Sequence, residues 1–253
     1  MSARVLIVNA DDLGQADGVN RGIAEAAERG IVRSASLMVR WPAAEQAADL
    51  FADRYPAVSL GLHVDLAEWA CRDGVWMPLY QVVDPDDADA VDDELSRQLG
   101  RFVRLTGALP THLDSHQHLH RQEPLRSRLL GAGGRLGIPV RGFGPVAYCG
   151  AFYGQAGKGD PYPEGITFDA LVSVLDGLAE GITELSCHPA ADDLAGLDSM
   201  YLAERAVERR VLCDPRLEAA LAARGITLGS FASPSPFPTG GRPPVLISGG
   251  PRP

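Results

Sequence analysis

The chain has little of what marks a secreted, membrane-spanning or disulfide-stabilised protein. Its four cysteines lie far apart and form no C-x-x-C pair. That spacing argues against a disulfide framework and predicts reduced thiols in a cytoplasmic protein. The N-terminus leads into only four consecutive strongly apolar residues, 5–8. Because a signal peptide or a spanning helix needs a much longer run, we expect neither, and no membrane as a partner.

Basic side chains are also scarce. The 253 residues carry 23 lysines and arginines against 33 acidic residues, which gives a net charge of −10. The chain has no basic block and no Lys/Arg-rich helix that could neutralise phosphates, so nucleic acid is not an expected partner. We interpret the acidic surface as a source of solubility.

What the chain does have is a regular alternation of apolar, β-branched segments with segments of helical character. The alternation predicts parallel strands joined by crossover helices. The expected strands are residues 5–10, 35–39, 58–64, 111–118, 139–143, 183–187 and 227–231. The expected helices are residues 19–29, 42–54, 92–106 and 203–224, the last interrupted near Asp214-Pro215. This number of units favours an α/β fold of the (β/α) barrel-like, distorted TIM type with seven or eight parallel strands.

Two regions depart from the alternation. Residues 142–165 are rich in glycine with interleaved phenylalanine and tyrosine, which predicts a long loop that serves as a lid or substrate wall. Residues 233–253 hold seven of the nineteen prolines and four glycines, which predicts a disordered tail or a surface arm. No internal repeat or linker divides the rest, so we expect one catalytic domain over residues 1–232.

The histidines are the most informative residues. All six fall in three segments: four lie within residues 111–120 (THLDSHQHLH), and the others are His63 and His188. Like the pair Asp11 and Asp12, they fall at or just beyond the ends of predicted strands. In a parallel barrel that edge carries the functional residues. Imidazoles and carboxylates gathered from distant segments are typical of a metal site, and we expect a hydrolytic one.

Structural roles are the alternatives at each position. Asp11 and Asp12 could form a turn or a helix cap. A lone His63 on a strand could be a core residue with satisfied hydrogen bonds, and Gly61 beside it indicates close approach of a ligand or another backbone.

The histidine cluster leaves its own alternatives open. On a strand, one face would carry all of the following side chains, because side chains alternate with a period of two: His112, Asp114, His116, His118 and His120. Alternation therefore does not choose between them as ligands. A helix is disfavoured by Pro110 just upstream, and a solvent-exposed, His-rich strand end remains the alternative without a metal.

Several segments together resemble the YdjC family of carbohydrate deacetylases, which includes the diacetylchitobiose deacetylases. They are residues 8–14 (VNADDLG), 61–63 (GLH), 111–120, 151–154 (AFYG), 187–190 (CHPA) and 229–231 (GSF). The resemblance spans nearly the whole chain up to Phe231. It implies a (β/α) barrel-like fold and a metal-dependent hydrolase that removes N-acetyl groups from amino sugars.

The resemblance also implies roles for individual residues. Asp12, His63 and His116 would bind the metal, with His118 as the alternative third ligand. Asp11 would be the general base and His188 the acid that protonates the leaving amine. The residues expected to contact the substrate are Tyr153, Phe152 and Asp114.

The implied cofactor is one divalent metal ion. Mg²⁺ or Zn²⁺ is expected, and Mn²⁺ or Co²⁺ would also suit the ligands. The implied partner is a small N-acetylated sugar or short oligosaccharide, and a homodimer is compatible with the sequence. Residues 69–89 do not share the resemblance and are expected to set sugar specificity. We expect the base and the acid to flank the acetyl group from opposite sides.

Other functions remain open at this stage. A metal-dependent sugar isomerase or epimerase also uses a barrel with histidine and carboxylate ligands, but it would release no acetate. A non-haem iron oxygenase shares the ligand set, but parallel strands argue against it. A non-catalytic sugar-binding or metal-binding protein would show no turnover.

Overall fold

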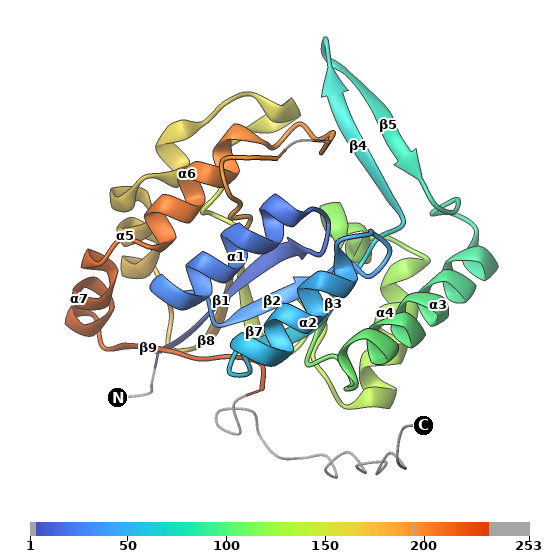
Figure 1. The fold of residues 1–253 in the computed structure, drawn as a ribbon, viewed down its shortest axis with the longest axis horizontal. Helices are drawn as coiled ribbons and strands as arrows, with labels where there is room; N and C mark the ends of the chain where they lie inside the picture. The colour runs from blue at the N-terminus through green and yellow to red at the C-terminus, as the bar shows by residue number, and fades with distance from the viewer. Residues whose placement is uncertain (1–3, 195, 233–253) are drawn as a thin grey trace.

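A curled, parallel seven-stranded sheet forms the centre of the computed structural model, which describes residues 4–194 and 196–232 (Figure 1). Its strand order is β6-β3-β2-β1-β8-β7, and β9 pairs in parallel with the first half of β1. The strands are β1 (Arg4–Leu13), β2 (Ser34–Leu37), β3 (Ser59–Val64), β6 (Leu113–Ser115), β7 (Val146–Cys149), β8 (Gly181–Cys187) and β9 (Ile226–Leu228). Because the order ends at β6 and β7, the sheet is a half-barrel.

Seven α-helices in the described part of the chain surround this sheet (Figure 1). They are α1 (Asp17–Arg29), α2 (Ala44–Arg54), α3 (Ala88–Thr106), α4 (Leu125–Leu136), α5 (Phe168–Asp176), α6 (Ala203–Leu212) and α7 (Arg216–Ala223). The predicted (β/α) barrel-like fold is thus confirmed in its distorted form. The assignment of residues 1–232 to one domain stays a prediction, and residues 233–253 lie outside the described residues.

Strand β1 shows why the inside of the half-barrel is apolar at one end and polar at the other. Side chains along a strand alternate between its two faces. Leu6 and Val8 belong to the large hydrophobic core, whereas Ile7 packs in a separate small cluster that includes Ile182 of β8. Further along the face of Ile7 come Asn9 and Asp11, which are buried polar residues. Polar groups therefore gather near the carboxyl ends of the strands.

The parallel register brings distant segments together at that end. Ala10 of β1 is paired with Cys187 of β8, so Asp11 and His188 follow side by side. On the other side of the sheet, His63 of β3 is paired with Asp114 of β6. These pairings place four of the segments singled out in the sequence at one edge: those of Asp11, His63, Asp114 and His188.

Some predicted elements need correction. The strand expected at residues 111–118 ends at Ser115, because Gln117 and His118 adopt left-handed φ values of 49° and 56° and a 3₁₀ turn follows. Residues 139–143 form no strand, since Val140 makes only isolated bridges. The loop expected at residues 142–165 contains β7. Helices α4 and α5 were not predicted.

The sequence interpretation also missed a hairpin that projects from the body of the molecule (Figure 1). It consists of β4 (Ala67–Arg72) and β5 (Val75–Gln81), paired antiparallel. Asp73 and Gly74 connect them with φ values of 52° and 76°. Two consecutive positive φ values characterise the tight turn for which Asp-Gly is a preferred sequence. The hairpin falls mostly within residues 69–89, the segment expected to set specificity.

Gly61 of β3 makes room for a side chain rather than for a ligand or another backbone. A Cβ atom there would lie 2.3 Å from Cε1 of His112, whose ring stacks on Phe231 at 4.0 Å. We expect Gly61→Ala to lower the free energy of unfolding by about 1–3 kcal/mol, because the packed imidazole would have to move. Urea unfolding measures this difference.

Gly100→Ala is the matched control for that measurement. A Cβ at this position in α3 would meet only a guanidinium nitrogen of Arg104, at 3.4 Å. Alanine is the better helix former, so we expect a gain of about 0.5–1 kcal/mol. Equal stabilities of Gly61→Ala and the parent protein would contradict the packing described for His112.

Candidate metal centre and active site

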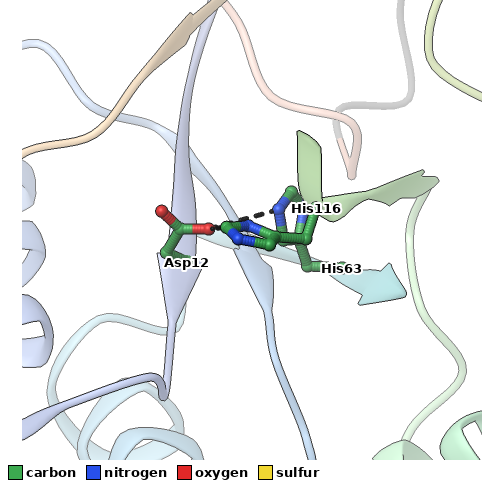
Figure 2. Close-up of side chains that lie close together, drawn as sticks. All are labelled: Asp12, His63 and His116. Atoms are coloured by element: carbon green, nitrogen blue, oxygen red, sulfur yellow. Dashed lines mark hydrogen bonds and ion pairs between the residues drawn. The ribbon is translucent and has the colours of Figure 1, made fainter. Parts of the chain in front are cut away.

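Three buried side chains from different strand ends converge on one point (Figure 2). They are Asp12, His63 and His116, and their ligand atoms all lie within 4.8 Å of one another. Oδ1 of Asp12 lies 3.0 Å from Nδ1 of His116 and 3.3 Å from Nε2 of His63. One carboxylate and two imidazoles form a donor set that suits a divalent metal and leaves positions open for water and substrate.

Backbone strain directs Asp12 into this cluster. Its φ of 67° lies in the left-handed region, and the β1–β2 register shifts between Ala10 and Leu13. Such a conformation is costly for a residue other than glycine and is concentrated at functional sites. The two adjacent aspartates consequently diverge, since Asp12 binds Arg205 at 2.7 Å while Asp11 binds Arg141 at 2.6 Å.

A second carboxylate contacts the other ring nitrogen of each histidine, the one that does not face Asp12. Nδ1 of His63 lies 2.8 Å from Oδ1 of Asp114, and Nε2 of His116 lies 3.4 Å from Oε2 of Glu68. Carboxylates in this position orient metal-binding imidazoles and raise their basicity. Nε2 of His116 and Oε2 of Glu68 are both buried and have no hydrogen-bond partner in the described residues.

The same carboxylates set the protonation of the cluster. Burial lowers the pKa of His63, but the charge and hydrogen bond of Asp114 outweigh it and raise that pKa to about 10. Burial also lowers the pKa of His116. The carboxylates of Asp12 and Glu68 outweigh burial, and the net pKa lies well above its usual value. Without a cation, protons therefore balance the carboxylates. A divalent ion would replace this positive charge, so the donor set fits a metal.

A second cluster of possible ligands lies nearby, but its carboxylates bind a guanidinium group. Asp11, His63 and Asp114 also lie within ligand distance of one another. Arg141, however, donates to both oxygens of Asp11 at 2.6 Å and lies 2.7 Å from Asp114. Its Nε also donates to Glu184 at 2.8 Å. Arg141 occupies both oxygens of Asp11, whereas Arg205 takes only Oδ2 of Asp12 and leaves Oδ1 facing the two histidines. The cluster of Asp12 is therefore the candidate metal site.

Asp11 is held as a carboxylate next to His188. Burial raises the pKa of Asp11, but Arg141 outweighs burial and the net pKa is lowered. Nε2 of His188 lies 3.8 Å from Oδ2 of Asp11, and its Nδ1 lies 3.9 Å from Oε1 of Glu208. The expectation that Asp11 and His188 flank the acetyl group from opposite sides is therefore corrected: they are neighbours.

All five residues proposed for metal binding and proton transfer line one cavity of about 640 Å³. Tyr153 also lines it, with its ring centroid 5.5 Å from that of His188. The cavity combines charged groups at the strand ends with aromatic side chains around them. That combination suits a small polar ligand with apolar faces.

Three predicted site residues lie elsewhere than expected. Phe152 is 1 % exposed and packs in the hydrophobic core, so the expected substrate contact is wrong. Asp114 is fully buried against Ser36, His63 and Arg141 and does not line the cavity, so it supports His63 instead. His118 lines the cavity but faces the Tyr148 hydroxyl at 2.9 Å, and lies in neither ligand group of the described residues.

Sequence interpretation also missed several residues of the site. Arg205 of α6 is 2 % exposed and holds Asp12, while Glu68 approaches His116 from the hairpin. Helical periodicity carries no signal for a buried arginine such as Arg205. Arg141 could have been noticed, because it interrupts the apolar segment 139–143 with a charge.

Comparison with known proteins gives one family. The profile of the family described as YdjC-like protein matches residues 5–223. A chitooligosaccharide deacetylase from Serratia marcescens is 33 % identical, and the alignment covers 90 % of this chain and 98 % of that protein. A carbohydrate deacetylase from Geobacillus stearothermophilus is 34 % identical, with 90 % and 97 % covered.

Solved structures show the same fold at lower identity. A proposed cellobiose-phosphate cleavage protein from Enterococcus faecalis superposes with a TM-score of 0.71 at 23 % identity, covering 91 % of this chain and 98 % of that one. A family 4 carbohydrate esterase from Streptomyces lividans superposes with a TM-score of 0.51 at 12 % identity, covering 90 % and 93 %. In the described part of the chain, no helix is long and apolar enough to span a bilayer.

Proposed function

The chain belongs to the YdjC-like protein family, and from that premise we propose that it is a metal-dependent carbohydrate deacetylase. Its substrate would be an N-acetylated amino sugar or a short oligosaccharide of such sugars. One observation carries the proposal: the cluster of Asp12, His63 and His116 opens into a cavity that Asp11 and His188 also line. The curated relatives named above support the reaction class.

Asp12, His63 and His116 would hold one divalent ion, with Mg²⁺ or Zn²⁺ as the proposed identity. When bound there, the ion would lower the pKa of a water molecule and polarise the acetyl carbonyl. Asp114 and Glu68 fix the orientation of the two imidazoles, and Arg205 fixes that of the Asp12 carboxylate. These contacts keep the donor atoms aimed at a common point before substrate binds.

Asp11 is the proposed general base. It is ionised because Arg141 holds its pKa down, so it can accept a proton as water attacks the acetyl carbon. Its two oxygens are fixed by Arg141, and Nδ2 of Asn9 donates to Oδ1 at 2.8 Å. The carboxylate is thus held in one orientation along the wall of the cavity.

His188 is the proposed acid. A sugar amine is a poor leaving group unless it is protonated, and an imidazole can deliver that proton. The 3.8 Å separation from Asp11 would let the proton taken from water pass to His188 and then to the amine nitrogen. Each turnover would then return both side chains to their starting protonation states. Catalytic contacts that are long without substrate commonly shorten when it binds.

Acetate release tests the proposal. The purified protein is incubated with N-acetylglucosamine and its oligomers, and acetate and free amine are measured alongside elemental analysis of the protein. We expect equal amounts of acetate and amine, and about one divalent ion per chain. An altered sugar without acetate would favour an isomerase or epimerase. Binding without turnover across the whole panel would favour a sugar-binding protein.

A further inference from the structure

One face of the β4–β5 hairpin adds two tryptophans to the wall of the cavity. Trp69 and Trp76 both line it, on the side of the hairpin. In the antiparallel register Trp76 is opposite Cys71, and Trp69 lies two residues before Cys71 on the same strand. Residues paired across strands, and those two apart along one strand, point to the same face. The two indoles therefore lie diagonally on one surface.

We propose that this tryptophan face is a subsite for a second sugar ring, beyond the ring that is deacetylated. The inference rests on the proposed function and concerns which substrate the same site prefers. Pyranose rings present apolar C–H faces, and a tryptophan offers a large, rigid apolar surface at a low cost in conformational entropy.

The length of the hairpin separates this subsite from the proposed metal. Glu68 contacts His116 at 3.4 Å, and Cys71, the partner of Trp76, lies three residues further along β4. Three residues of a β-strand span about 10 Å. A single pyranose ring is shorter than that. A sugar bound with its acetyl group beside Asp12 and Asp11 would therefore leave Trp76 uncovered, and a second ring would reach it.

Exposure supports a ligand at Trp76. Trp76 is 52 % exposed, and the neighbouring Met77 is 42 % exposed. Met77 is paired with Ala70, so it points to the opposite face, and it does not line the cavity. Of these two exposed apolar residues, only Trp76 faces the candidate active site.

The hairpin is anchored so that its tryptophan face is formed before a ligand binds. The side-chain amide of Gln117 makes two hydrogen bonds to the backbone of Trp69, at 2.7 and 2.9 Å. At the base, the Tyr80 hydroxyl donates to Asp65 at 2.8 Å. Towards the tip, Arg72 binds Asp198 at 2.7 Å. A surface fixed in this way loses little entropy on binding.

The test compares the full-length parent protein with Trp76→Ala and Met77→Ala. For each, acetate release gives kcat/KM for the dimer of N-acetylglucosamine and for the monomer. The readout is the ratio of the two values. We expect Trp76→Ala to lower this ratio about fivefold to tenfold, whereas Met77→Ala, the matched control, keeps the parent ratio. An unchanged ratio in Trp76→Ala, or an equal drop in both variants, overturns the subsite.

A binding measurement separates this proposal from the proposed function. If the parent protein releases no acetate from either sugar, the deacetylase assignment fails, and calorimetric titration with the same dimer still tests the subsite. Weaker dimer binding in Trp76→Ala than in Met77→Ala supports it, and equal binding overturns it. A Trp76→Ala variant that changes self-association but not sugar binding would assign the tip to an interface between copies of the chain, which also overturns it.

Discussion

Asp11→Asn is expected to abolish acetate release while leaving the metal in place. An amide cannot accept the proton of the attacking water, and loss of a general base costs about 10²–10⁴ in rate. The Asp12 cluster does not include Asp11. Steady-state acetate release and the metal content of the purified variant measure the two effects separately.

The variant should fold, because the contacts of Asp11 are largely preserved. Asparagine keeps one oxygen for Arg141, whose guanidinium also retains Asp114 and Glu184. Urea unfolding checks this. Parent-level turnover in Asp11→Asn would contradict the assignment of the base. Loss of the metal would indicate that Asp11 is a ligand.

His63→Ala is expected to lose both the metal and the activity. The substitution removes one of the three donors and leaves Oδ1 of Asp114 without its imidazole partner. Removing even an outer partner of a metal ligand typically costs 10–100-fold in metal affinity, so loss of a ligand should cost more than about 100-fold. Titration of the metal-free variant with Zn²⁺ or Mg²⁺ measures the change.

His118→Ala is the control for His63→Ala. Both substitutions remove an imidazole that lines the cavity, but His118 is bonded to Tyr148 and lies outside the ligand cluster. We expect His118→Ala to keep the parent affinity for the metal. Retained affinity in His63→Ala together with loss in His118→Ala would move the ligand position to His118.

The strand-end positions of the site could be predicted because they follow from local patterns. Apolar runs mark β1, β3 and β8, and polar residues follow where each run ends. Parallel register then brings those ends to one edge, as the pairing of Ala10 with Cys187 shows. This step requires only the strand ends and the parallel direction of the strands, and no knowledge of individual long-range contacts.

The choice between histidines could not be reached in the same way. Strand alternation holds only while the backbone stays extended, and it ends at Ser115. The left-handed conformations of Gln117 and His118 turn His118 towards Tyr148, and Gln117 towards the hairpin. A period-two pattern carries no sign of such a turn.

The contacts of Arg141 and Arg205 could not be predicted from the sequence for a different reason. Their carboxylate partners Asp11 and Asp12 are 130 and 193 residues away along the chain. Nothing local to a helix or a loop indicates contacts of that range. The hairpin, in contrast, left a signal in Asp73-Gly74, which was missed because the flanking residues do not alternate cleanly between apolar and polar.

Metal removal and restoration tests the central claim most directly. The protein is stripped with a chelator, shown by elemental analysis to be metal-free, and assayed for acetate release before and after a divalent ion is added back. We expect no acetate above the blank from the stripped protein, and recovery of acetate release at about one ion of Mg²⁺ or Zn²⁺ per chain. Parent-level acetate release by the metal-free protein would contradict this claim.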